Sequence, residues 1–335
     1  MRRWFTIAAG AGLLLAGCTD SRSPTQPTIG APSFLDIKDQ HGPRTHIMKP
    51  RGQSNPHKGG GGNSGIFYHG GPVIYSQKVV AVYWGASQVY KGGPDPVTAP
   101  TGTGDADGSL VGFFLRNLGG SSYFNINTTY TDGAGTHIQN VVSYTQYWAS
   151  NTNLPPTDMS PVDDATIQAK VQEGFDSGNL TYEPSTLYAV FTGSGVNLGG
   201  GFGTQYCAYH GYFTDNLGRN VKYAAMPFAG QTGSCNALQG TPNDDFDADA
   251  VINVLAHETE ETTTDENLNA WYDNIGNENA DKCAWQFGTP YLAANGATAN
   301  MKIGGKDFLI QMNWVNATTT GKGNRQYAVG CKQGW

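Results

Sequence analysis

Apolar residues follow strand-like spacing in several parts of this chain. Runs rich in β-branched and aromatic residues, bounded by Gly, Pro, Asn or Asp, are typical of buried strands. One region, 205–230, contains two such runs around Asp215–Gly218, which predicts a hairpin with its turn there. The other predicted strands are 72–85 (a strand or a hairpin), 137–148, 185–193 and 306–315.

Helical spacing of apolar residues marks three further segments, 107–120, 161–178 and 246–264. The first is expected to begin with Asp107 as its cap and to stop at a Gly-Gly pair, and the second opens with Pro and Asp. Acidic residues at the start of the third suit the positive end of a helix dipole. Strands and helices alternate without an internal repeat. We therefore expect one α+β domain over 66–335, a mixed sheet with backing helices.

The third predicted helix carries the sequence HETEE, in which His257 and Glu261 are four residues apart. Residues at this spacing lie on one face of an α-helix, and an imidazole and a carboxylate can together bind zinc. Glu258 lies about 100° round the helix from His257, where it can reach a metal-bound water as a general base. We therefore expect a zinc site, although calcium or manganese also suits two carboxylates and one histidine. An acidic helix that contains a histidine by chance is the alternative.

The third metal ligand has two candidates beyond this helix. Asp281 fits better by its distance along the chain, and Glu278 fits better by residue type. We expect Glu278 to bind the metal and Asp281 to support it. His210, in the predicted hairpin, is a further candidate for binding the metal or an oxyanion during catalysis. A histidine packed in a strand is the simpler interpretation of His210.

The first 18 residues, MRRWFTIAAGAGLLLAGC, combine two Arg, a short apolar run and small residues directly before Cys18. This pattern resembles a bacterial lipoprotein signal, which implies that Cys18 becomes the lipid-carrying first residue. An ordinary signal peptide with an incidental cysteine is the alternative. Residues 19–65 are rich in Pro, Ser, Gln and Gly, so we expect a flexible linker in which His41, His46 and His57 are solvated. The protein is thus expected to be exported and anchored at the cell envelope, or extracellular.

The remaining cysteines are even in number, which in an exported chain predicts disulfides. We expect Cys207 to pair with Cys235 and Cys283 with Cys331, since no C-x-x-C spacing supports a cysteine-rich zinc site. The formal net charge of −7 gives no basic stripe for a nucleic-acid partner. The expected partners are a membrane, through the lipid anchor, and a peptide or cell-wall polymer as substrate or ligand.

Six segments follow one another in a distinctive order: YHGGPVIY, VVAVYWG, NLGGSSYFNINTTYTDG, AHETEETTTDENLNAWYD, NENADKCAWQFG and DFLIQMNWV. Together they resemble the phosphate-induced protein 1 family, also called EXORDIUM-like, over residues 66–331. The resemblance implies an exported, cell-wall or extracellular protein. It also implies a similar H-E-x-x-E helix and a following E-x-x-D-x-C segment, but no settled biochemical activity.

The run HETEETTTD followed by NENAD also resembles the thermolysin-like zinc peptidases. That resemblance implies a zincin-like fold, in which a long helix carries the metal site. The leading expectation is therefore a surface-anchored metal-dependent hydrolase, a zinc peptidase above all, with Glu258 as general base. The alternative is a non-catalytic protein that binds a cell-wall glycan or a protein partner and uses the metal structurally. An open coordination position would separate the first from the second.

Overall fold

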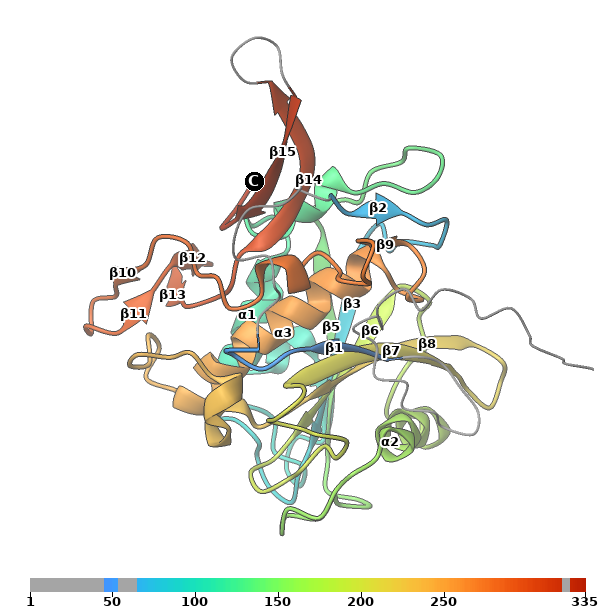
Figure 1. Ribbon diagram of the computed structural model, residues 1–335. Coiled ribbons are helices and arrows are strands. Elements are labelled where there is room, and N and C mark those ends of the chain that lie inside the picture. The colour runs from blue at the N-terminus through green and yellow to red at the C-terminus, as the bar shows by residue number, and fades with distance from the viewer. Residues whose placement is uncertain (1–44, 54–64, 321–325) are drawn as a thin grey trace, which may run out of the picture. The chain divides into compact units, whose positions relative to one another are not determined.

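The computed structural model describes residues 45–53, 65–320 and 326–335, all of which belong to one compact unit. Its centre, in this described part, is a mixed sheet with the strand order β1-β7-β8-β6-β3-β5-β4 (Figure 1). Strands β5, β3, β6 and β8 run parallel, whereas β1, β7 and β4 pair antiparallel with their neighbours. The sheet strands are β1 Thr45–Met48, β3 Gln77–Trp84, β4 Thr101–Thr103, β5 Val142–Ser150, β6 Thr186–Thr192, β7 Ala208–Thr214 and β8 Asn220–Met226.

Helices cover both faces of this sheet. Helices α1 (Leu110–Leu118) and α3 (Phe246–Thr264) pack on one face, and α2 (Asp164–Asp176) packs on the other (Figure 1). Successive residues of a strand point to opposite faces, so Val79 lies in the core with α1 and α3 while Val80 lies in the core with α2. The predicted α+β class, with a mixed sheet and backing helices in one domain, is confirmed.

Small two-stranded ribbons flank this sheet. They are β2 Phe67–Tyr68 with β9 Trp271–Tyr272, β10 Tyr291–Leu292 with β11 Thr298–Ala299, β12 Met301–Ile303 with β13 Lys306–Phe308, and β14 Asn313–Thr320 with β15 Gln326–Lys332. Short 3₁₀ turns lie in the connections of the described chain, at Gly104–Ala106, Phe124–Thr129, Ala229–Gln231, Gly233–Cys235 and Asp281–Cys283. The predicted single strand over 306–315 is wrong. The chain leaves β13 after Phe308, and β14 begins only at Asn313, so two ribbons share this apolar run.

The predicted helices are confirmed, with one difference at a cap. Asp163 caps α2, and its carboxylate accepts a hydrogen bond from the backbone N–H of Thr166 at 2.9 Å. Ser109, not Asp107, caps α1. Asp107 is buried instead and accepts hydrogen bonds from the hydroxyls of Tyr83 and Tyr144 at 2.6 and 2.7 Å. A carboxylate held by two tyrosines from the sheet ties the start of α1 to β3 and β5.

The predicted linker over 19–65 is wrong for Thr45–Met48, which form β1 at the edge of the sheet next to β7. All four residues are buried, and His46 has no exposed surface, so the prediction of a solvated His46 is wrong. Composition missed this strand because four residues are too few to offset the polar segments around them. His41, His57, Cys18 and the predicted signal peptide lie outside the described residues.

Both predicted disulfides are present. Cys207 pairs with Cys235, and Cys283 pairs with Cys331, with Cα–Cα distances of 5.3 and 5.6 Å. The first links the start of β7 to the turn before α3, and the second links the Asp281–Cys283 turn to β15. Such bonds persist in an oxidising compartment, which supports an extracellular location. Among the described helices, none has the length and apolar character needed to cross a membrane.

Candidate metal centre

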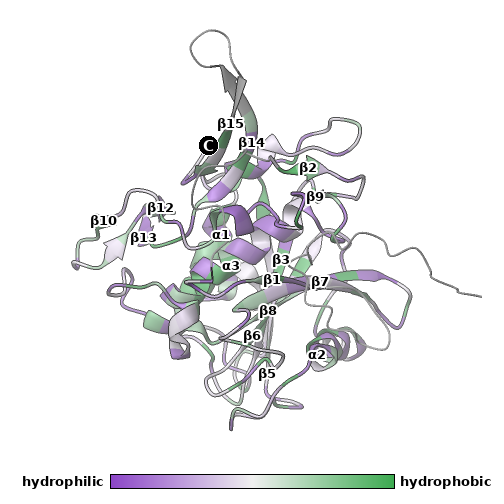
Figure 2. Cartoon of the chain, in the orientation of Figure 1, coloured by the Kyte–Doolittle hydropathy of each residue, from purple (hydrophilic) through white to green (hydrophobic). Residues whose placement is uncertain are grey.

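Helix α3 carries its polar residues into the interior of the protein. Figure 2 shows hydrophilic residues along this helix, and His257, Glu258 and Glu261 have no exposed surface. Threonine hydroxyls in the same stretch donate to backbone carbonyls four residues earlier, as from Thr259 to Leu255 and from Thr263 to Thr259, both at 2.7 Å. These local bonds satisfy hydroxyls that would otherwise be buried without a partner.

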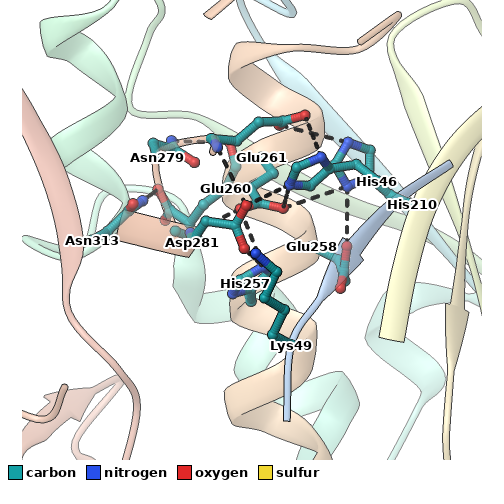
Figure 3. A network of polar contacts seen from close by, with 12 residues as sticks. His46, Lys49, His210, His257, Glu258, Glu260, Glu261, Asn279, Asp281 and Asn313 are labelled. Atoms are coloured by element: carbon teal, nitrogen blue, oxygen red, sulfur yellow. Dashed lines mark hydrogen bonds and ion pairs between the residues drawn. The ribbon is translucent and has the colours of Figure 1, made fainter. Parts of the chain in front are cut away.

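Segments far apart in the sequence meet at this face of α3. His46 on β1 and His210 on β7 are direct cross-strand partners in the sheet, and their ring centroids are 5.6 Å apart. Glu278 and Asp281 come from the turn that follows β9. Figure 3 shows His46, His210, Glu261 and Asp281 gathered in one place, with Lys49 reaching into the same cluster. The histidines and the carboxylates of Glu258, Glu261, Glu278 and Asp281 are all buried. Backbone pairing across β1 and β7 is therefore what brings two imidazoles to the helix.

One group of candidate ligands is formed by His257, Glu261 and Asp281. Nε2 of His257 lies 3.1 Å from Oε1 of Glu261 and 3.7 Å from Oδ1 of Asp281. The backbone N–H of Asp281 donates to Oε1 of Glu261 at 3.0 Å, which fixes the turn against the helix. These three residues each offer a ligand atom within 4.8 Å of the others. The arrangement favours Asp281 over Glu278 as the partner of His257.

Glu278 lies with His46 and His210 instead. Its Oε1 is 3.5 Å from Nδ1 of His46, and its Oε2 is 3.7 Å from Nε2 of His210. Asp281 also contacts His46, whose Nε2 is 2.6 Å from Oδ2 of Asp281. Glu261, Glu278 and His46 form a second group with ligand atoms within 4.8 Å of one another.

Glu258 pairs with His210 across the interface between α3 and β7. Nδ1 of His210 lies 3.0 Å from Oε2 of Glu258, and Oε1 of Glu258 has no hydrogen-bond partner. Burial and the neighbouring Glu261 charge raise the pKa of Glu258 well above its ordinary value. Burial and the charges of His46 and His257 lower the pKa of His210 well below its ordinary value. Both groups are therefore driven toward their neutral forms in the metal-free protein.

Gln311 orients the ring of His257. Its side-chain nitrogen lies 2.9 Å from Nδ1 of His257 and donates to the carbonyl of Ala280 at 3.1 Å. Its side-chain oxygen accepts the backbone N–H of Trp285 at 3.4 Å. Both ends of the carboxamide are therefore held, and Gln311 fixes the ring of His257 with Nε2 toward Oε1 of Glu261.

Several buried polar atoms of this cluster have no hydrogen-bond partner among the described residues. They include Nε2 of His210, Nε2 of His257, Oε2 of Glu261 and both side-chain oxygens of Glu278. Buried polar groups are rarely left unpaired, because each costs free energy comparable to a lost hydrogen bond. Imidazole nitrogens and carboxylate oxygens are ligands that zinc and manganese accept. The buried His, Glu and Asp groups thus fit a metal ion.

The structure brings together His210, His257, Glu258, Glu261, Glu278 and Asp281, all of which the sequence singled out, and adds His46. The only local signal for His46 is that Thr45-His46-Ile47-Met48 is a short β-prone run inside a polar segment. Comparisons with family models, curated proteins and solved structures found no match for this chain. The fold and the site together define this chain as an α+β protein that is stabilised by disulfides. It contains a buried cluster of His, Glu and Asp residues that could hold a metal ion.

Proposed function

We propose that this chain is an exported metal-dependent hydrolase, with zinc as the metal and a peptide as the substrate. The observation that carries the proposal is the convergence of His257, Glu261 and Asp281 beside Glu258 on one buried face of α3. Three protein ligands leave one position of a tetrahedral zinc for water or substrate, as in catalytic zinc sites.

The chemistry of the proposed reaction uses two residues of this chain directly. A bound zinc would lower the pKa of water toward about 7 and polarise a substrate carbonyl. Glu258 would accept the proton of the attacking water at Oε1, which has no hydrogen-bond partner among the described residues. His210 contacts Oε2 of the same carboxylate at 3.0 Å and holds it in one orientation. Glu258 would later return the proton to the leaving amine.

Other features support the broader assignment. A long helix that carries its metal ligands against a mixed sheet accords with a zincin-like architecture. The ordered motifs over 66–331 support membership of the phosphate-induced protein 1 family, and the residues before Cys18 support a lipid anchor at the cell envelope. A peptide or a cell-wall polymer would be the substrate at that location.

A second candidate function is a non-catalytic extracellular protein in which the metal only stabilises the fold. Complete burial of the site favours it, because His257, Glu258 and Glu261 have no exposed surface and structural metal sites are closed. Such a protein would bind a cell-wall glycan or a protein partner.

The test compares three variants of the purified protein. Glu258→Gln should keep the metal and lose hydrolysis of an unfolded protein substrate by a factor of about 10² to 10⁴. His257→Gln should lose metal and activity together. Glu260→Gln is the matched control, since Glu260 is equally buried but is bound by Asn313 outside the candidate ligand groups.

The outcomes separate the two functions. Metal in the wild type without hydrolysis of any substrate in a broad peptide and glycan screen would favour the structural role. Hydrolysis that survives Glu258→Gln would overturn Glu258 as the base. Loss of activity in Glu260→Gln as well would show that the variants act through folding.

A further inference from the structure

Glu261 presents its two carboxylate oxygens to two different groups of ligands. Its Oε1 lies 3.1 Å from Nε2 of His257 and accepts the N–H of Asp281. Its Oε2 lies 3.7 Å from Nε2 of His46 and 3.7 Å from Nδ1 of His210, and it has no hydrogen-bond partner. A carboxylate placed in this way can bind one ion through each oxygen, as a bridging ligand does.

Oε2 of Glu261 faces a second group of possible ligands, which is separate from His257 and Asp281. Glu278 belongs to this second group. Among the described residues, neither of its side-chain oxygens has a hydrogen-bond partner, although the residue is fully buried. Its oxygens lie 3.5 Å from His46 and 3.7 Å from His210. Two ligands of a tetrahedral ion, each about 2.1 Å from it, are about 3.4 Å apart, so these separations suit a shared ion.

The negative charge of the cluster also favours a second metal ion. Glu258, Glu261, Glu278 and Asp281 bring four carboxylates into a site with almost no solvent. In the described part of the chain, histidines are the basic groups in contact with Glu258, Glu261 and Glu278. The charge of Lys49 acts on Asp281. Ionised carboxylates without a compensating charge are costly in the interior. With Lys49 beside Asp281, one divalent cation would still leave negative charge on the four carboxylates when they are ionised, and a second would compensate it.

We propose that this centre holds two divalent transition-metal ions rather than one. His257, Asp281 and Oε1 of Glu261 bind the first, and His46, Glu278 and Oε2 of Glu261 bind the second. The assignment of the first ion rests on the proposed function, whereas the second position is additional to it. Zinc and manganese both accept this mixture of imidazole and carboxylate ligands.

His210 has a positioning role at the second position. Its Nδ1 contacts Glu258, and its Nε2 points toward Glu278 without a hydrogen-bond partner. The ring of His210 therefore lies between Glu258 and Glu278 and orients both carboxylates. Since two-metal hydrolases hold their ions about 3.5 to 4 Å apart, a single bridging carboxylate such as Glu261 can join both.

The test is the metal content of the full exported protein, loaded with zinc, dialysed and measured by mass spectrometry. We expect about two ions per chain in the wild type and about one in Glu278→Gln, with His46→Gln behaving like Glu278→Gln. Glu260→Gln is the matched control and should keep both ions. Circular dichroism of each variant shows whether it folds, and a variant that fails to fold is replaced by Glu278→Asp, which retains the charge but withdraws the ligand.

A second readout reports the bridge without any activity assay. Loaded with manganese, the wild type should show the weakened, spin-coupled electron paramagnetic resonance signal of two ions joined by one carboxylate. Glu278→Gln should show the six-line signal of an isolated ion. An uncoupled wild-type spectrum would overturn the shared Glu261 bridge.

The number of metal ions bound per chain distinguishes the possible outcomes. One ion in the wild type would overturn the second position and leave the proposed hydrolase intact. No ion would overturn both. Two ions in the wild type and also in Glu278→Gln would overturn Glu278 as the ligand that defines the second position.

Discussion

Individual side chains at the site have their proton affinities set by burial and by their neighbours. Burial alone would lower the pKa of His46, but the charges of Asp281 and Glu261 outweigh it and raise that pKa to about 9. Burial alone would raise the pKa of Asp281, but the charge and hydrogen bond of His46, together with the charges of His257 and Lys49, outweigh it and lower that pKa. In the metal-free protein these two residues therefore form a buried ion pair, with 2.6 Å between Nε2 and Oδ2. A metal bound at the site would compete with the proton of that imidazole.

The ion pair makes the stability of the metal-free protein depend on pH. The pKa of His46 rises from about 6.5 in the unfolded chain to about 9 in the folded protein. Its contribution is therefore fully present below about pH 6.5 and is lost as pH rises through about 9. The shift corresponds to about 3 kcal/mol of unfolding free energy.

Urea unfolding of the chelator-treated protein at several pH values between 6 and 10 measures this dependence. The difference in unfolding free energy between the wild type and His46→Gln should shrink across that interval. The comparison with His46→Gln removes the contribution of other groups, including Glu258 and Glu278, whose raised pKa values act in the same direction. A constant difference would mean that no charged His46–Asp281 pair exists.

At the scale of elements, capping and the helical repeat explain α3, whereas no local pattern explains the turn that completes the site. Asp245 caps α3 through the N–H of Ala248, and the helix spans the predicted 246–264. The helical repeat alone then places His257 beside Glu261. The turn at Asp281–Cys283 has no such local rule, and the Cys283–Cys331 disulfide ties it to β15.

Removing that disulfide should weaken metal binding as well as the fold. Cys283→Ala/Cys331→Ala is expected to lower the unfolding free energy by about 3 to 4 kcal/mol and to reduce zinc affinity, because it frees the turn that holds Asp281. Cys207→Ala/Cys235→Ala is the matched control, with a similar cost in stability and a smaller effect on zinc. Denaturant unfolding and zinc titration measure the two quantities, and equal losses of affinity in both variants would contradict this role.

At the scale of the whole molecule, the disulfides place the folded domain in an oxidising compartment. The proposed lipoprotein signal before Cys18 would add a route to the outside and a means of attachment. A protein held at the envelope in this way would act on polymers nearby, such as the proposed peptide or cell-wall substrate.

Substitution of Cys18, the proposed lipidation residue, tests this attachment. Expressed in a bacterium that processes lipoproteins, the wild type should partition into the detergent phase, and Cys18→Ser should be found in the aqueous phase or remain as an uncleaved precursor. The folded domain should keep any bound metal, since the candidate ligands lie within residues 46–281. Equal partitioning of both proteins would contradict the anchor. Cys207→Ala/Cys235→Ala, which leaves Cys18 intact, provides the control.

The sequence by itself determined the features that depend on local periodicity. The spacing of apolar residues was enough for α1, α2 and α3, for β6 and for the β7–β8 hairpin, because each is governed by contacts a few residues apart. It was also enough to place His257, Glu258 and Glu261 on neighbouring faces of one helix. An even cysteine count and chain order gave the disulfide pairing, which the structure confirms.

Only the tertiary structure decided which distant residues join that helix. His46 is separated from Asp281 by 235 positions, yet their side chains are in contact, because β1 adds to the sheet beside β7. The positions of Glu278 and Asp281 likewise follow from the packing of their turn against α3, which no spacing along the chain encodes. A strand of four residues in a polar segment carries too weak a local signal to reveal its partner. The pairing of β1 with β7, a long-range contact, thus adds His46 to the candidate metal centre, and local periodicity could not predict it.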